Sequence, residues 1–177
     1  RFVAAGRAAG AQVVTYGLIA AADVRGRGLV EDDAGVTFEV DGPDGNATLR
    51  LELLGRFNVH NALAVIALGA GLGLDPAAVR AGLASVTAIP GRMERVTLGQ
   101  PFEVIVDYAH SPASLETVLD QLASAASARD GGVIAVFGSA GERDTAKRPL
   151  MGRIAAERCR LVIVTDEDPR GEDRDAI

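Results

Sequence analysis

The sequence predicts an α/β fold in two parts, because the hydrophobic period changes along the chain. Short segments at 36–40 and 47–53 alternate apolar and polar residues, as half-buried β-strands do. The last part follows a β-α-β-α-β pattern, with apolar strands at 102–106, 132–138 and 161–166. These strands begin about 30 residues apart, which suits right-handed crossovers in a parallel sheet.

The segment up to residue 54 carries the signals of an antiparallel arrangement. The stretch "AQVVTYG" (11–17) is apolar and ends in glycine, and Leu49, Leu51 and Leu53 share one face of a later strand. Before that strand, "DGPDGN" (41–46) supplies the Gly, Pro, Asp and Asn residues that favour a hairpin turn. We therefore expect short antiparallel strands here.

Helical spacing begins at Asn58. Leu63, Ile66, Ala67 and Ala70 recur at helical intervals, and a pair of nearby glycines then supplies a stop signal. The spacing predicts a helix over this stretch.

A second helix is expected after Asp75-Pro76, an N-cap residue followed by proline at the first helical position. The breaker "IPGR" (89–92) follows it. We place a domain boundary at this breaker, which divides the chain into 1–90 and 91–177.

The crossover helices of the last part have different signals. The first begins with Ser111 as N-cap and Pro112 after it, and its apolar face carries Leu115, Val118, Leu119 and Leu122. The second, at 146–158, carries the apolar residues Leu150 and Ile154.

The composition of the chain excludes some classes of binding partner. The 177 residues are 48% hydrophobic with a net charge of −6, so the chain can bury a core and is a poor binder of nucleic acid or anionic membranes. Cys159 is the only cysteine, which fits a reducing compartment, and no apolar run approaches a membrane span. The chain begins at Arg1 rather than Met, and we expect it to be an internal piece of a longer protein.

Charged and glycine-rich stretches follow the three predicted parallel strands. They read "DYAHSP" (107–112), "GSAGERDTAKRP" (138–149) and "TDEDPRGED" (165–173). Ligands of open parallel sheets lie beyond the carboxyl ends of the strands, so we expect these stretches to converge on one rim. Asp107 could accept hydrogen bonds from ligand hydroxyls or cap the following helix. His110 could contact a phosphate or base, or serve as a capping or packing residue.

Two arginines occur in these stretches. The planar forks of Arg143 and Arg170 suit carboxylate or phosphate binding, and surface ion pairing is the plainer alternative. Glu167 and Asp168 could meet a ligand ammonium or simply be solvated. The stretch "GSAGERD" (138–144) resembles a phosphate-cradling loop but lacks the GK[ST] of a P-loop.

Asn58 and Asn61 are three residues apart, so they share a helix face or form a cap. An asparagine amide can read the donor and acceptor edge of adenine. Capping by Asn58 is the alternative, and both interpretations stay open at this point.

Five ordered stretches together resemble the Mur ligases, in particular the branch that adds a diamino acid to a peptidoglycan precursor. They are "GRFNVHNALAVIA", "PGRMERV", "VDYAHSPASLE", "VFGSAGERDTAKRPLMG" and "TDEDPRGED". The resemblance implies that 1–90 is the C-terminal part of the central ATPase domain. It implies that 91–177 is the first part of a Rossmann-like C-terminal ligase domain with a parallel sheet.

The activity that the resemblance implies is ATP-dependent amide ligation through an acyl phosphate, with ATP and Mg²⁺ as cofactors. The substrates would be UDP-N-acetylmuramoyl-L-Ala-D-Glu and a diamino acid, meso-diaminopimelate ahead of lysine or ornithine. A cytoplasmic monomer is expected. The residues implied for ATP are Asn58, Asn61, Arg92, Asp107 and His110. Those implied for the amino acid are Arg143, Glu167, Asp168 and Arg170.

The sequence also departs from the family pattern. It reads "EDPR" (167–170) where the family has Asp-Asn-Pro-Arg, and the acid at 168 could suit a bare ammonium. It contains neither the GxxGK[ST] loop nor the lysine that is carbamylated in the family. We therefore expect no catalytic residue within the segment and no ligase activity from the segment alone.

Three other interpretations compete with this one. A folylpolyglutamate synthase-like ligase would share the ATP machinery, but "AGERDTAKRPLMG" and "DPR" favour the diamino-acid branch. A non-catalytic nucleotide-binding module, or a degenerate ligase subunit, would lack a P-loop upstream. A plain α/β domain with solvated strand ends is the third.

Overall fold

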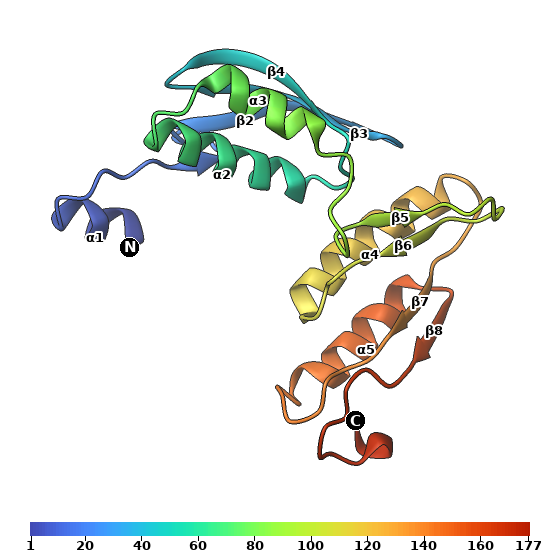
Figure 1. Cartoon of the computed structure of the whole chain (residues 1–177). Coiled ribbons are helices and arrows are strands. Elements are labelled where there is room, and N and C mark those ends of the chain that lie inside the picture. The colour runs from blue at the N-terminus through green and yellow to red at the C-terminus, as the bar shows by residue number, and fades with distance from the viewer. The chain divides into compact units, whose positions relative to one another are not determined.

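A four-stranded sheet covered by helices forms most of the first part of the molecule. The computed structural model describes all 177 residues and separates into two units, Arg1–Val106 and Asp107–Ile177. In the first unit the strand order is β1-β2-β3-β4. The strands are β1 (Tyr16–Gly17), β2 (Val24–Asp32), β3 (Gly35–Gly42) and β4 (Gly45–Leu51), as Figure 1 shows.

The expected hairpin is formed by β3 and β4. Asp41 pairs with Asn46 and Gly42 with Gly45, which leaves Pro43 and Asp44 as the two residues of the turn. The antiparallel prediction is confirmed for β2, β3 and β4. It is wrong for β1, which pairs with β2 in parallel over two residues.

Two elements of the first unit have no hydrophobic pattern from which their secondary structure could be predicted. The strand β2 contains Gly26 and Gly28 and changes register between Arg27 and Val30, so its hydrophobic alternation is interrupted. The helix α1 (Phe2–Ala8) has no buried residue, although its sequence is mostly apolar.

The helix α2 (Phe57–Gly71) supplies the helical side of the first core. Its Val59 and Leu63 are fully buried in one cluster with Phe38 of β3 and Leu51 of β4. The helical prediction from Asn58 onward is confirmed. Burying these side chains removes apolar surface from water, which holds the helix on the sheet.

The helix α3 (Pro76–Ser85) begins as expected. The side chain of Asp75 accepts a hydrogen bond from the amide of Ala77 at 3.0 Å, and Pro76 occupies the first turn. Leu83 packs against the first core. The chain then turns at the 89–92 breaker, where Ile89 and Arg92 form an isolated bridge.

The strand predicted at 102–106 is present but does not join the parallel sheet as expected. β6 (Val104–Val106) pairs in antiparallel fashion with β5 (Glu94–Val96), and the parallel sheet consists of β7 and β8. The loop between β5 and β6 is short, so closing this hairpin costs little entropy. The contact-based units divide after Val106, and the domain boundary at 90/91 stays a prediction.

The second unit contains the expected parallel pair. β7 (Ile134–Phe137) and β8 (Leu161–Val164) are connected through α5 (Lys147–Arg158). The helix α4 (Pro112–Ser127) begins with a capping box, in which Ser111 and Ser114 each satisfy the other's backbone amide. A short 3₁₀ helix, η1 (Arg174–Ala176), follows β8.

The second core lies between α4, α5 and the parallel pair. Leu115 and Leu119 of α4 pack with Ala135 of β7 and with Met151 and Ala155 of α5. On α5 the side chain of Leu150 is exposed, whereas that of Met151 is 1% exposed and lies in the core. None of the helices combines the length and hydropathy that crossing a membrane requires.

Replacing a buried leucine of α2 should destabilise the first unit. We expect Leu63→Ala to lower the free energy of unfolding by about 2–5 kcal/mol, because it leaves a cavity in the first core. Leu68→Ala on the same helix is the control, since Leu68 is 63% exposed and should change the value by less than about 0.5 kcal/mol. Urea titration monitored by circular dichroism measures both. Equal losses would contradict the placement of this helix face.

The pair of Asp32 and Arg50 should make stability depend on acid. Hydrogen bonds from Arg50 at 2.7 Å lower the pKa of Asp32 to about 2 from 3.8. Its stabilising contribution is therefore fully present above about pH 4 and is lost as the pH falls through about 2. We expect the stability difference between the wild type and Asp32→Asn to shrink over that window and in high salt. Asp44→Asn in the hairpin turn is the control, and a difference that is independent of pH would contradict this role of Asp32.

Candidate functional site

The loops after the two parallel strands touch each other. We call residues 138–146 the β7 loop and residues 165–173 the β8 loop. The amide of Gly141 donates to the carbonyl of Asp168 at 2.8 Å, and the amide of Thr165 donates to the carbonyl of Phe137 at 3.1 Å. Two of the three charged strand ends therefore meet, as the parallel arrangement predicts.

Glycine is required in the β7 loop for this contact. A Cβ atom on Gly138 would lie 2.3 Å from the carbonyl oxygen of Thr165, and one on Gly141 would lie 2.0 Å from that of Pro169. The predicted close backbone approach is thus present, but the neighbour is the β8 loop. The resemblance of this loop to a phosphate cradle stays a prediction, and the contact that its glycines allow in the structure is with protein backbone.

A partly buried ion pair ties both loops to α5. Arg148 Nη2 donates to Glu172 Oε2 at 2.7 Å and to the carbonyl of Ala140 at 3.4 Å. The two side chains are 12% and 28% exposed. The other oxygen of Glu172 accepts from the amide of Glu142 at 2.7 Å. This amide, and then Arg148, lower the pKa of the Glu172 carboxyl, so it is charged at neutral pH.

Sequence reasoning missed this pair. Arg148 and Glu172 are 24 residues apart, and neither carries a local signal of the contact. One signal was available on the helix: Arg148 shares a face with the buried residues Met151 and Ala155, at spacings of three and seven. An arginine on a buried helix face needs a partner.

The predicted amino-acid residues occupy the two loops. Arg143 is exposed on the β7 loop and has no hydrogen-bonding partner within the chain. On the β8 loop Arg170 Nε lies 3.3 Å from Asp168 Oδ2, and the Asp168 side chain is the more exposed of the two. Glu142 and Arg170 have positive φ angles of 54° and 51°, which cost about 1–3 kcal/mol each in a residue other than glycine.

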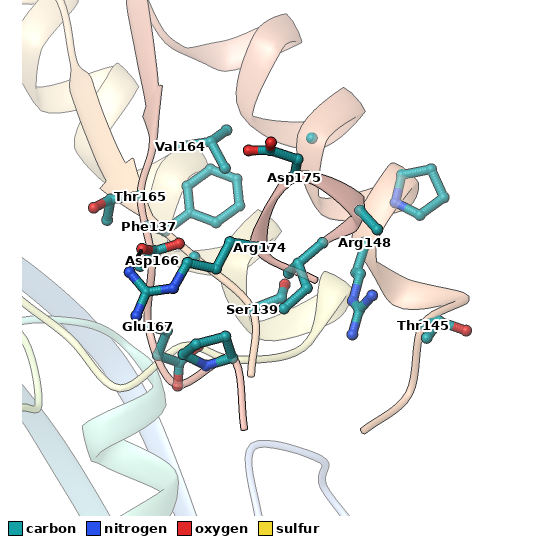
Figure 2. Close-up of a pocket in the computed structure, with 16 residues that line it drawn as sticks. Phe137, Ser139, Thr145, Arg148, Val164, Thr165, Asp166, Glu167, Arg174 and Asp175 are labelled. Carbon is teal, nitrogen blue, oxygen red and sulfur yellow. Dashed lines mark hydrogen bonds and ion pairs between the residues drawn. The ribbon is translucent and has the colours of Figure 1, made fainter. Parts of the chain in front are cut away.

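A hollow of about 720 Å³ opens beside the same loops. Arg148, Thr145 and Ser139 line it from one strand end, and Asp166 and Glu167 line it from the other. Figure 2 shows Arg174 reaching toward Asp166, whose Oδ2 lies 2.8 Å from Arg174 Nη1. Of the predicted amino-acid residues, only Glu167 lines this hollow.

Asp107 and His110 precede α4 in the second unit. Asp107 Oδ1 accepts from the amide of Ala109 at 2.8 Å, so it stabilises a turn, and the cap of α4 is Ser111. His110 Nδ1 lies 3.1 Å from the carbonyl of Tyr108. A proton on Nδ1 satisfies this contact and leaves Nε2 as an acceptor. The carbonyl of His110 accepts from Lys147 Nζ at 2.7 Å.

Asn58 and Asn61 lie at the start of α2 in the first unit. Asn58 is 2% exposed and its Nδ2 donates to the carbonyl of Leu54 at 2.7 Å. Its Oδ1 accepts from Asn61 Nδ2 at 3.0 Å. Asn58 therefore makes no side-chain N-cap, and the capping interpretation was wrong. Of the two amides, that of Asn61 is the exposed one.

The remaining predicted ATP residue, Arg92, is exposed in the breaker of the first unit. The five predicted ATP residues thus divide between the units, with three in the first and two in the second. No group of three or more His, Cys, Asp or Glu side chains is arranged to hold a metal ion.

Two family models match successive parts of the chain. The model described as "Mur ligase middle domain" matches residues 1–69. The model described as "Mur ligase, glutamate ligase domain" matches residues 91–177. The order agrees with the resemblance seen in the sequence motifs.

Curated relatives with high identity carry related names. The chain is 50% identical over 94% of its length to a "UDP-N-acetylmuramyl-tripeptide synthetase" of a Roseiflexus species. It is 44% identical over 89% of its length to a "UDP-N-acetylmuramoyl-L-alanyl-D-glutamate--2,6-diaminopimelate ligase" of Solibacter usitatus. The chain spans 32% and 31% of these relatives, so about a third of their length.

Solved structures give the same result. A 2,6-diaminopimelate ligase of the same name matches 99% of this chain and 36% of its own, with 32% identity and a TM-score of 0.56. A "UDP-N-acetylmuramoylalanyl-D-glutamyl-2,6-diaminopimelate--D-alanyl-D-alanyl ligase" from Acinetobacter baumannii matches 94% of this chain and 36% of its own, with 25% identity and a TM-score of 0.73. A folylpolyglutamate synthetase of Lactobacillus casei shares the fold, with 20% identity over 96% of this chain and 41% of its own and a TM-score of 0.66. With both family models matched in order and relatives of these names, the chain belongs to the Mur ligase family.

Proposed function

We propose that this chain is part of an ATP-dependent ligase that joins a diamino acid to UDP-N-acetylmuramoyl-L-Ala-D-Glu. The observation that carries the proposal is the ordered match to the Mur middle and glutamate ligase domains, together with relatives named for this reaction. In the proposal, residues 1–90 end the central ATPase domain and residues 91–177 begin the ligase domain. The whole enzyme is a cytoplasmic monomer acting on small molecules.

The reaction forms an amide from a carboxylate and an amine. Transfer of a phosphoryl group from ATP to the D-Glu carboxylate gives an acyl phosphate and ADP. The amine then attacks the acyl carbon, loses a proton, and expels phosphate through a tetrahedral intermediate. Catalysis of this kind depends mainly on positioning and on neutralising charge. The proposed task of the β7 and β8 loops is to hold the incoming amine.

The charges on the two loops fit the far end of meso-diaminopimelate. That end carries both an ammonium and a carboxylate. Arg143 and Arg170 supply planar donors for a carboxylate, and Asp168 and Glu167 supply acceptors for an ammonium. Because Asp168 already lies 3.3 Å from Arg170, the pair presents both charges side by side. Lysine and ornithine would leave the arginines without a carboxylate.

The proposed ATP contacts divide by role. Asn61 carries the exposed amide and is the proposed adenine contact, whereas buried Asn58 holds it in place through the 3.0 Å hydrogen bond. Arg92, Asp107 and His110 are proposed to reach ATP from their own segments. The chain has no cluster of three or more His, Cys, Asp or Glu side chains arranged to hold a metal ion, so none of its residues is proposed as a Mg²⁺ ligand.

Three amines compared in one assay test the substrate. With the ligase that contains this segment, ATP and the UDP-linked dipeptide, we expect phosphate release to be fastest with meso-diaminopimelate. Lysine and ornithine should react more slowly, because they lack the carboxylate that the arginines bind. Reactions without the dipeptide are the control for ATP hydrolysis alone. Activity with lysine or ornithine only would contradict the proposed substrate.

Variants of Arg143 and Asp107 should separate the two binding functions. Arg143→Ala should raise the KM for the amino acid about 10-fold or more and change the KM for ATP little, because it removes a charge-assisted contact to one substrate. Asp107→Ala should show the opposite bias.

The matched control for these variants is Arg153→Ala. Arg153 is exposed on α5 and forms no ion pair, so this change should leave both KM values unaltered. Equal effects of Arg143→Ala on the two KM values would remove Arg143 from the proposed amino-acid role.

A further inference from the structure

We propose that Arg148 and Glu172 form an ionic clamp that fixes the β7 loop against the β8 loop and thereby positions Arg143 and Arg170 for the amino acid. The inference rests on the proposed function for the role of the two arginines. Arg148 and Glu172 are positioning residues in it, because neither is proposed to touch the substrate.

The contacts of the clamp reach both loops from one helix. Arg148 of α5 donates through a single nitrogen to Glu172 on the β8 loop at 2.7 Å and to the Ala140 carbonyl on the β7 loop at 3.4 Å. Glu172 returns to the β7 loop by accepting from the amide of Glu142 at 2.7 Å. Removing the Arg148 charge would therefore take away the hydrogen bonds from this side chain to both loops, and removing the Glu172 charge would weaken its bond to the β7 loop.

The Arg148–Glu172 pair is less exposed to solvent than the Arg170–Asp168 pair of the same site. Arg148 is 12% exposed and Glu172 is 28% exposed, whereas Arg170 and Asp168 are 34% and 61% exposed at a longer distance of 3.3 Å. Solvent and salt screen exposed pairs strongly, so they contribute little. The Arg148–Glu172 pair is therefore the shorter and less exposed of the two, and the one that solvent screens less.

A second nitrogen of the Arg148 guanidinium is also enclosed by the protein. Arg148 Nε is buried and has no hydrogen-bond partner. A buried donor without an acceptor is unfavourable. Its burial is consistent with a side chain held in place by the contacts that its far end makes with the two loops.

The clamp acts next to strained backbone. Glu142, whose amide binds Glu172, has a φ angle of 54°, and it immediately precedes Arg143. Arg170 has a φ angle of 51° and lies two residues before Glu172. Residues other than glycine keep this conformation only where the surrounding structure enforces it. The direction of both arginines depends on these two angles, so it depends on the clamp.

Kinetics of three variants test the clamp in the ligase that contains this segment. Arg148→Met keeps the apolar stem without the charge, Arg148→Lys keeps the charge without the fork, and Glu172→Gln keeps the shape. We expect Arg148→Met and Glu172→Gln to raise the KM for the diamino acid about 10-fold, with the KM for ATP changed less than about 2-fold. Arg148→Lys should fall between them and the wild type. The control is Arg153→Met on the exposed face of α5.

Amide hydrogen exchange of Glu142 provides a readout that does not depend on activity. We expect this exchange to quicken in Arg148→Met and Glu172→Gln, while the amides of the buried turn around Leu119 stay protected. Unchanged Glu142 exchange together with an unchanged amino-acid KM would overturn the proposal. A parallel rise in both KM values would also overturn it, because the pair would then support only the fold.

The outcomes separate this inference from the proposed function. If Arg143→Ala and Arg170→Ala leave the amino-acid KM unchanged, the substrate role of the arginines fails. Glu142 exchange then still decides whether Arg148 and Glu172 hold the loops together.

Discussion

Close backbone contact between the β7 and β8 loops is the constraint on which the candidate site depends. The loops meet through the hydrogen bond from Gly141 to Asp168, and side chains at Gly138 or Gly141 would collide with the carbonyls opposite. Because the loops touch, charges from two strand ends lie beside one hollow. The Arg148–Glu172 pair then links this contact to α5, whose other residues on that face are buried in the second core.

The first unit also holds one of its candidate residues through a neighbouring side chain, here by packing and amide hydrogen bonds. Leu63 and Val59 fasten α2 to its sheet, and the adjacent Asn58 uses both ends of its amide within the chain. A buried amide whose oxygen and nitrogen are both hydrogen-bonded is held rigidly and does not lower stability. A buried amide left unpaired would destabilise the fold. Its partner Asn61 is thereby held at the protein surface. In the first unit a buried polar residue thus contacts an exposed one through a direct hydrogen bond.

Local signals in the sequence predicted much of the fold. Asp75 and Ser111 cap their helices, and the 41–46 hairpin forms with the expected turn, because each depends on neighbouring residues alone. The partner of β6 could not be predicted in the same way, since an apolar strand does not specify which strand it joins.

Local sequence signals predicted less of the candidate site than of the fold. Arg143 and Arg170 were predicted because charged residues after parallel strands share a rim, and their binding role stays a prediction. Arg148 and Glu172 were missed because their contact joins residues that are distant in sequence. The glycines of the β7 loop predicted close approach but could not name the neighbour. The fold does not identify the ligand of the arginines. The proposed ligand comes from the resemblance of the motifs.

A crystal structure of the ligase containing this segment, with meso-diaminopimelate and a non-hydrolysable ATP analogue bound, tests the central claim most directly. We expect the distal carboxylate of the amino acid within hydrogen-bonding distance of Arg143 and Arg170, and its distal ammonium beside Asp168 or Glu167. The Arg148–Glu172 contact should stay intact in the complex. An amino acid bound away from the β7 and β8 loops, or Arg143 and Arg170 turned into solvent, would contradict the claim.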